Sequence, residues 1–271
     1  MTDASLPAEL RRARIAERVR EDGVLRVAEA ATAFGVSEVT IRADLVQLEA
    51  AGLVRRVHGS ALPVPGGPRE EPVERVSGRD AATKRAIGRR AASLVEGGTS
   101  VLLDVGSTTL AVAHALVDRA ERGDLDELVV VTNGLTIALA LEAAVPRITV
   151  VLTGGTLRPL QHSLVDPGAS ESIAGLHVDL AILGCNGLDA DGRITNLNLA
   201  EAEVKRAMIA ASAAQLVVAD VGKLGARHLG LVGVAGPATT LVTAGPWTDA
   251  AASTAASLAS LGARVIRADA R

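Results

Sequence analysis

A run of small, polar residues follows an apolar segment near residue 100. Asp104 ends the apolar segment, and Gly106, Ser107, Thr108 and Thr109 come next, where the pattern changes to that of a helix. Backbone N–H groups at a helix N-terminus, with hydroxyl groups beside them, suit a phosphate group. Serine and threonine also cap ordinary helices, which is the alternative interpretation. We include Asp104 and these four residues in a predicted phosphate-binding site.

Three other turns follow apolar segments that have the pattern of strands. They are Thr132-Asn133-Gly134, Thr153-Gly154-Gly155 and Gly184-Cys185-Asn186-Gly187. In a parallel sheet, ligands bind beyond the carboxyl ends of the strands, so we expect these turns to meet at one edge. Each alone could be a plain turn, but together they predict one ligand site. The residues predicted to line it are Asn133, Gly154, Gly155, Asn186 and Gly187.

Only three of the 28 basic residues are lysines, at positions 84, 205 and 223. Lys205 follows Glu201 by one helical turn, which places both side chains on one helix face. Lys223 comes after Asp220, directly beyond another predicted strand. An ammonium group suits phosphate, and a carboxylate can accept hydrogen bonds from sugar hydroxyls. We assign these four residues to the same ligand site, with solvated ion pairs as the alternative.

The first sixty residues have the pattern of a small helical domain. Helices are expected over residues 8–22 and 28–34, and a third begins after Ser37, a good N-cap. In the third helix Ile41, Leu45 and Leu48 recur at helical spacing and must face the core. A turn through residues 35 and 36 joins the last two helices as in a helix-turn-helix, and residues 53–61 have the pattern of a two-stranded wing.

In this arrangement the third helix enters the major groove with its first residues at the base edges. The predicted contacts of this helix with DNA are Ser37, Glu38, Val39, Thr40 and Arg42. Phosphate contacts from the wing are predicted for Arg55, Arg56 and His58. The alternative is a helical domain whose charges are merely solvated.

Composition limits the class of protein further. A net charge of −3 argues against a uniformly basic wrapper of nucleic acid, and Phe34 and Trp247 are too few for a platform that stacks single-stranded bases. One cysteine, Cys185, excludes a disulfide framework and is more typical of a packing residue than of a nucleophile. The histidine spacing indicates no metal site, and we expect no cofactor. No apolar run reaches the roughly 18 residues of a membrane span, and no secretory signal is evident, so a cytoplasmic protein is expected.

Beyond the first domain, residues 63–80 concentrate proline, glycine and charge and are predicted to be a linker between domains at 1–62 and 81–271. In the large domain Val- and Leu-rich strands alternate with helices, which predicts an α/β fold with a mainly parallel sheet. Strands are expected at 100–104, 128–132, 148–152, 180–183, 216–219, 240–243 and 263–266. Helices are expected near 84–96, 108–119, 135–143, 200–213 and 248–260.

The motifs resemble those of the DeoR-type bacterial transcriptional regulators. In the N-terminal part they are FGVSEVTIRADL at 34–45, LEAAGL at 48–53 and RVHG at 56–59. In the large domain they are KRAIG at 84–88, DVGSTT at 104–109, VTN at 131–133, LTGG at 152–155, EAEVKRAMI at 201–209 and DVGK at 220–223. The resemblance implies a winged helix-turn-helix followed by a sensor domain that is similar to sugar-phosphate isomerases and commonly binds a phosphorylated sugar.

By this resemblance, the 104–109 loop and Lys223 would hold a phosphate or nearby hydroxyls, and Asp104, Asn186, Glu201 and Lys205 would line the sugar. Four positions depart from the family pattern. Ala43 stands where an arginine is usual, Ser60 where a glycine is usual, Gly222 where Ser or Thr is usual, and Ala244 where Asp is frequent.

The leading hypothesis is therefore a DNA-binding repressor of a carbohydrate operon, relieved by a phosphorylated sugar. It would bind double-stranded operator DNA as a homo-oligomer, either a dimer or a tetramer. One alternative is a sugar-phosphate isomerase or deaminase with a regulatory N-terminal domain, since fold does not establish function. Another is a regulator that senses a nucleotide, because the glycine- and threonine-rich loops are not specific for sugars.

Overall fold

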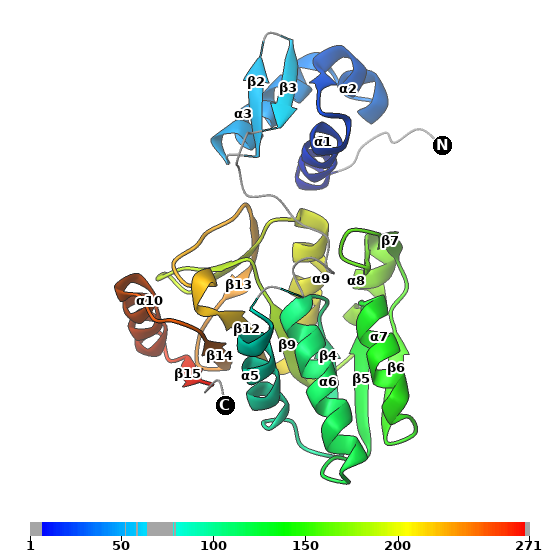
Figure 1. Ribbon diagram of the computed structural model, residues 1–271. Helices are drawn as coiled ribbons and strands as arrows, with labels where there is room; N and C mark the ends of the chain where they lie inside the picture. The colour runs from blue at the N-terminus through cyan, green and yellow to red at the C-terminus, as the bar shows by residue number, and fades with distance from the viewer. Residues whose placement is uncertain (1–6, 52, 58, 64–77, 79, 269–271) are drawn as a thin grey trace. The chain divides into compact units, whose positions relative to one another are not determined.

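The computed structural model describes residues 7–51, 53–57, 59–63, 78 and 80–268. These residues form two compact units, a small N-terminal one and a larger C-terminal one (Figure 1). His58 and most of the predicted linker lie outside the described residues, so the phosphate contact expected of His58 has no structural account. Among the described helices, none combines the length and the apolar character that crossing a membrane requires.

The N-terminal unit has the predicted helix-turn-helix and wing. Its elements are α1 (Ala8–Asp22), β1 (Leu25–Arg26), α2 (Val27–Phe34), α3 (Glu38–Ala50), β2 (Val54–Val57) and β3 (Ser60–Pro63). Gly35 ends α2 in the left-handed region with φ 63°, a conformation that glycine adopts without strain. Ser37 then caps α3, because its hydroxyl accepts a hydrogen bond from the Thr40 N–H at 3.1 Å. The wing is a sheet of three strands in the order β1-β3-β2.

The core of this unit confirms the helical spacing of the sequence. Ile41, Leu45 and Leu48 are at most 2% exposed and pack with Ile15 and Val19 of α1. Burying such apolar side chains contributes about 1.5–3 kcal/mol each to folding. A buried ion pair between α1 and α3 accompanies this core: Arg11 Nε donates to Asp44 Oδ2 at 2.6 Å.

The C-terminal unit is a parallel α/β sheet with additional β-structure. Its main strands are β4 (Ser100–Leu103), β5 (Leu128–Thr132), β6 (Ile148–Leu152), β9 (Val178–Gly184), β12 (Ser212–Asp220), β14 (Thr239–Ala244) and β15 (Arg264–Arg267). They form one sheet in the order β15-β14-β12-β9-β4-β5-β6, and every neighbouring pair is parallel. The predicted fold class is thus confirmed, and each predicted strand corresponds to one of these seven.

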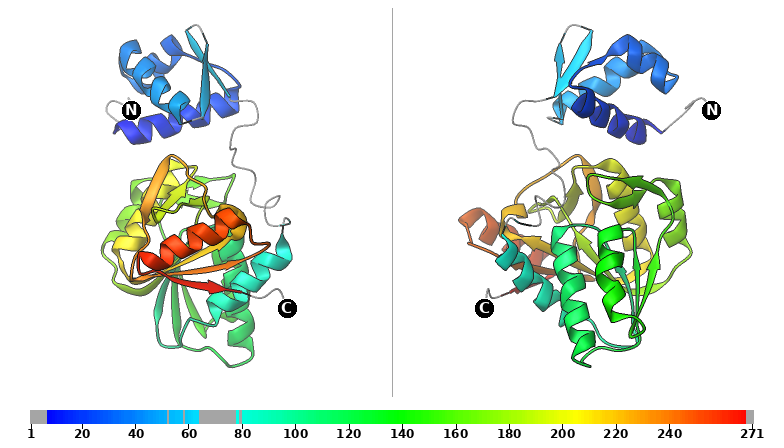
Figure 2. Two further views of the ribbon diagram at one scale, coloured as in Figure 1. Left: turned by 90° about the vertical axis from the view of Figure 1, so that its left-hand side faces the viewer. Right: turned by 45° about the vertical axis from the view of Figure 1, so that its right-hand side comes forward.

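Helices cover both faces of the sheet. They are α5 (Ala81–Ala92), α6 (Ser107–Glu121), α7 (Leu135–Leu141), α8 (Pro167–Ala174), α9 (Leu199–Ala210) and α10 (Asp249–Ser260), with two 3-10 turns, η1 (Glu142–Ala144) and η2 (Val221–Lys223). Alternate strand residues point to opposite faces. Leu216 and Val218 therefore join a core under α5, α6 and α7, whereas Val217 and Ala219 join a second core that includes residues of α9 and α10. Figure 2 shows α5 and α10 on opposite sides of the sheet.

Three features of this unit were absent from the sequence expectations. They are the hairpin β7 (Thr156–Arg158) and β8 (Ser163–Val165), the helix α8, and a small sheet of β10 (Gly187–Leu188), β11 (Arg193–Asn196) and β13 (Gly230–Val234). These strands have two to five residues, too few for a clear alternating pattern. Two of these features, the hairpin and the small sheet, contribute residues to the edge of the main sheet where the predicted site lies.

Candidate functional site

The first turns of α3 present the side chains that were predicted to reach DNA bases. Val39 is 72% exposed although it is apolar, and Glu38 and Arg42 are exposed beside it. Arg42 Nη2 lies 2.5 Å from Glu38 Oε2, one helical turn away. Ala43, which stands where the family has an arginine, is exposed on the same helix. An exposed valine next to an arginine suits contact with a thymine methyl group and a guanine edge.

Other predicted DNA contacts already have partners within the protein. Ser37 and Thr40 bond to each other, with 2.9 Å between the two hydroxyl oxygens, so their first role is to cap α3. On the wing, Arg56 Nε donates to Glu49 Oε2 at 2.6 Å, and these bonds lower the pKa of Glu49. Arg55 is exposed and is the wing cation best placed for a phosphate contact.

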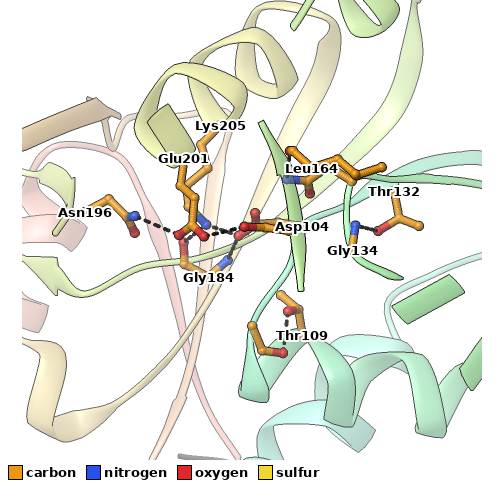
Figure 3. A network of polar contacts seen from close by, with 12 residues as sticks. Asp104, Thr109, Thr132, Gly134, Leu164, Gly184, Asn196, Glu201 and Lys205 are labelled. Carbon is orange, nitrogen blue, oxygen red and sulfur yellow. Dashed lines mark hydrogen bonds and ion pairs between the residues drawn. The ribbon is translucent and has the colours of Figure 1, made fainter. Parts of the chain in front are cut away.

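In the C-terminal unit, Asp104 and Lys205 form a buried ion pair at the carboxyl edge of the sheet. Asp104 follows β4 and is 1% exposed, while Lys205 of α9 is 3% exposed. Asp104 Oδ2 accepts from Lys205 Nζ and from the Gly184 N–H at 2.9 Å, as Figure 3 shows. Burial raises the pKa of the Asp104 carboxyl, and the Lys205 ammonium offsets part of that rise. Within the described chain, the second oxygen, Oδ1, has no hydrogen-bond partner.

Glu201 lies one turn before Lys205 on α9, as the spacing predicted, and is bound on three sides. Its Oε1 pairs with Arg158 Nη1 at 2.5 Å and accepts from the Ser163 hydroxyl at 2.7 Å. Its Oε2 accepts from Asn196 Nδ2 at 3.3 Å. All four side chains are buried, and they join the hairpin β7–β8 and the strand β11 to α9. The carboxylate of Glu201 therefore holds these elements together.

The predicted phosphate loop turns sharply between β4 and α6. Gly106 has φ 141° and precedes the first residue of α6, whose N-terminus has no side-chain cap. Thr109 is fully buried, and its hydroxyl donates to the Gly106 carbonyl at 2.9 Å, so it shapes the loop. Ser107 and Thr108 remain partly exposed at the helix N-terminus, where N–H groups favour an anion.

Lys223 lies at the end of β12 in η2, near Cys185 and His228. Its ammonium disfavours the charged form of His228, whose pKa is lowered mainly by burial, while a hydrogen bond to the Asn186 backbone acts in the opposite direction. Across the described residues, no side chain forms a hydrogen bond or ion pair with Lys223 Nζ. Asn186 and Asp220 are partly buried in the same region. The structure therefore brings Lys223 and Lys205 together around Cys185.

Three glycines predicted to line the site serve close backbone packing. A Cβ at Gly155, where φ is 122°, would lie 2.5 Å from the Val165 carbonyl oxygen. A Cβ at Gly187 would lie 2.4 Å from the Ala226 carbonyl oxygen. A Cβ at Gly154 would lie 3.3 Å from the Gly168 carbonyl oxygen, a tight contact. Packing alone accounts for these glycines, and their contact with a ligand stays a prediction.

Sequence reasoning missed four residues of this region: Arg158, Ser163, Asn196 and His228. Arg158 is the clearest case, because it is 8% exposed although arginine is rarely buried unless paired. Its only sequence signal is a lone arginine in a short alternating segment. Of the described residues, no group of three or more histidine, cysteine, aspartate and glutamate side chains could hold a metal ion.

Cys185 is expected to react very slowly with alkylating reagents. Burial raises the pKa of its thiol to about 12, so the reactive thiolate is scarce at pH 8 and increases as the pH rises. Compared with a free cysteine of pKa about 8.5, labelling by iodoacetamide at pH 8 should be about a thousandfold slower. Mass spectrometry of the intact protein measures this rate without interference, because the chain has one cysteine. Labelling as fast as that of free cysteine would contradict the raised pKa of this thiol.

The two units define a class of protein: a winged helix-turn-helix domain and a parallel α/β domain with buried polar and charged residues at the carboxyl edge of its sheet. Comparison with known proteins agrees. The DeoR-like helix-turn-helix domain matches residues 11–64, and the DeoR C terminal sensor domain matches residues 79–244. This protein belongs to the DeoR family of DNA-binding transcriptional regulators.

Relatives extend over most of the chain. One is the "HTH-type transcriptional regulator GlpR" of Haloferax volcanii, 36% identical over 82% of this chain and 84% of its own. Another is the "Putative aga operon transcriptional repressor" of Escherichia coli O157:H7, 33% identical over 81% and 80%. A third is the "Glycerol-3-phosphate regulon repressor" of Escherichia coli K12, 31% identical over 78% and 81%.

Similar solved structures are more distant. Ribose 5-phosphate isomerase from Plasmodium falciparum has a TM-score of 0.40 at 16% identity, covering 54% of this chain and 53% of its own. The translation initiation factor eIF-2B of Pyrococcus horikoshii has a TM-score of 0.39 at 14% identity, covering 83% and 70%.

Proposed function

We propose that this regulator is a cytoplasmic repressor of a carbohydrate operon and that a phosphorylated sugar releases it from its operator. The observation that carries the proposal is that one chain contains both an exposed face on α3 and a buried carboxylate, Asp104, at the edge of the sheet. Among the described residues, one oxygen of this carboxylate has no hydrogen-bond partner. The names of two relatives support the same function: one is the "Putative aga operon transcriptional repressor" and the other the "Glycerol-3-phosphate regulon repressor".

On the DNA side, the proposal assigns base contacts to Val39 and Arg42 and a phosphate contact to Arg55. These side chains are exposed, and the apolar core behind α3 fixes the direction in which they point. A helix-turn-helix reads one half-site, and two half-sites require two copies of the chain. The proposal therefore includes a homo-oligomer with two-fold symmetry.

On the effector side, Lys223 and the N-terminus of α6 are suited to the phosphate, and Asp104 to a sugar hydroxyl. Lys223 has an ammonium without a partner among the described side chains, and Asp104 Oδ1 is an acceptor without a donor. In this proposal the protein binds the sugar phosphate but does not catalyse its isomerisation or deamination. Its support is that the carboxylates of Glu201 and Asp104, which acid–base catalysis would use, already form ion pairs with Arg158 and Lys205.

Release of DNA requires that the effector bind two conformations of the protein with different affinity. Glu201 is suited to carry this change, because it connects the hairpin β7–β8 to the first turn of α9. An effector that contacts Asp104 next to Lys205 would act on the same helix. This change then alters the positions of the two DNA-binding domains of the oligomer relative to the half-sites.

The Lys223→Ala protein is expected to bind operator DNA like the wild type but to lose its response to the effector. Removing one charged hydrogen bond to a phosphate costs about 1.5–3 kcal/mol, which shifts the dose-response curve by roughly 10- to 150-fold. The measurement is the effector concentration that half-releases labelled operator DNA. The Arg264→Ala protein is the control, because Arg264 is exposed at the opposite end of the strands. An unchanged curve for Lys223→Ala would remove Lys223 from the site.

A further inference from the structure

Asp104, Asn133 and Thr153 occupy equivalent positions on three neighbouring strands. In the sheet, Leu103 of β4 pairs with Thr132 of β5, and Thr132 pairs with Leu152 of β6. The three polar residues are each the next residue along the chain. The N–H groups of Asp104 and Thr153 extend the sheet ladder, donating to the Ile182 carbonyl at 3.0 Å and to the Thr132 carbonyl at 2.9 Å. Equivalent positions in a parallel sheet point to the same face.

All three side chains are buried, and each has an oxygen without a partner. Asp104 and Asn133 are 1% exposed, and Thr153 is 6% exposed. In the described part of the chain, no donor reaches Asp104 Oδ1 or Asn133 Oδ1, and Thr153 Oγ1 has no partner of either kind. An unsatisfied buried polar atom destabilises the folded state. Three in a row across adjacent strands indicate a place where a ligand supplies the missing bonds.

The chemistry of the row selects a ligand with several hydroxyl groups. Asn133 Nδ2 donates to the Leu164 carbonyl at 3.1 Å, which leaves Oδ1 as a pure acceptor. Asp104 Oδ1 is also an acceptor, whereas a threonine hydroxyl can donate or accept. Lys205 already neutralises Asp104, so a second cation in the row would add an uncompensated buried charge. Neutral hydroxyl donors satisfy the row without that cost.

The length of the row sets a lower limit on the ligand. Neighbouring strands lie about 4.8 Å apart, so the backbones of Asp104 and Thr153 are about 10 Å apart. Glycerol 3-phosphate has two hydroxyls, so with its phosphate held at Lys223 and the N-terminus of α6 it can satisfy at most two of the three oxygens. A pentose or hexose phosphate has enough hydroxyls for all three.

We infer that Asp104, Asn133 and Thr153 form a polyol-recognition row, which binds successive hydroxyls of a sugar phosphate of at least five carbons and discriminates against glycerol 3-phosphate. This inference rests on the proposed function and specifies the class of effector. The β7–β8 hairpin covers the row at Asn133, whose carbonyl accepts from the Leu164 N–H at 2.7 Å.

The test is calorimetric titration of the full chain with glycerol 3-phosphate and with a panel of pentose and hexose phosphates. The variant is Thr153→Val, which deletes an oxygen that makes no bond and so leaves the melting temperature of the free protein unchanged or higher. Thr243→Val is the matched control, because Thr243 Oγ1 is also buried and unpartnered but lies on β14, away from the row. Thr153→Ser retains the hydroxyl.

We expect at least one pentose or hexose phosphate to bind the wild type more tightly than glycerol 3-phosphate. Thr153→Val should weaken that ligand about fivefold, the equivalent of one neutral hydrogen bond, while Thr243→Val and Thr153→Ser stay near the wild type. The row is refuted if sugar phosphates bind but Thr153→Val has the same affinity for them as Thr243→Val. It is also refuted if glycerol 3-phosphate binds the wild type as tightly as the sugar phosphates do. In both cases the proposal that the protein senses a phosphorylated compound remains. If no compound binds the wild type, the sensing proposal falls together with the row.

Discussion

The Lys205→Met protein is expected to lose about 3–5 kcal/mol of the free energy of unfolding at pH 7, because Asp104 is left as a buried charge without its counter-ion. Both side chains are almost completely inaccessible, so water cannot replace the lost ammonium. Urea denaturation followed by circular dichroism measures the difference. The Asp104→Asn/Lys205→Met double variant is the matched control, since it removes both charges, and it should recover most of the loss.

The loss should also depend on pH in a defined direction. Burial already raises the pKa of Asp104, and removing Lys205 takes away the charge that opposes this rise. In Lys205→Met the folded state therefore binds the Asp104 proton more tightly than the unfolded state does. The destabilisation is complete above the raised pKa and disappears as the pH falls toward about 4, the ordinary aspartate value. A loss below 1 kcal/mol at pH 7, or one that grows on acidification, would contradict the buried ion pair.

The Arg42→Ala protein is expected to bind its operator about 10- to 100-fold more weakly, because a bidentate contact of arginine with a base contributes about 1–3 kcal/mol. Its affinity for scrambled DNA should change much less, so the ratio of specific to non-specific binding falls. Stability should hardly change, since the Arg42–Glu38 pair is exposed and such pairs contribute little. Fluorescence anisotropy with labelled operator and scrambled duplexes measures both affinities.

Arg18→Ala provides the matched control for this prediction. Arg18 of α1 is exposed and pairs with Asp22 at 3.3 Å, one helical turn away, as Arg42 pairs with Glu38. Both substitutions thus remove one exposed arginine and one local ion pair. Equal effects of the two on operator binding would show that Arg42 acts only through its charge, and the assignment of α3 as the reading helix would fail.

The spacing of apolar residues, together with the glycine and capping residues that end and begin helices, predicted most of the fold. The spacing of Ile41, Leu45 and Leu48 defined the buried face of α3, and Gly35 with Ser37 defined the turn before it. In the large unit, the runs of valine and leucine predicted all seven strands of the parallel sheet because such strands are buried on both faces. The grouping of Asp104 with Lys205 followed from two rules: ligands bind at the carboxyl edge, and residues four apart share a helix face.

The rest depends on contacts between residues distant in sequence. Arg158 lies 43 residues before Glu201, and no local pattern indicates that its guanidinium is buried against that carboxylate. No local pattern singles out His228, yet a loop places it beside Lys223 and Asn186. Gly155 is required by its close approach to the Val165 carbonyl, which no local pattern indicates, and its contact with a ligand stays a prediction. Tertiary packing decides such cases, and a single sequence does not reveal it.

The central claim is that a sugar phosphate bound by the C-terminal unit releases DNA bound by the N-terminal unit. It is tested most directly by anisotropy of labelled DNA from upstream of the gene, at two salt concentrations, followed by a panel of sugar phosphates. The account predicts binding that is tighter than to scrambled DNA and is reversed by one compound of the panel. Equal, weak binding to both DNAs that collapses with salt would contradict it, because phosphate contacts alone would explain that result.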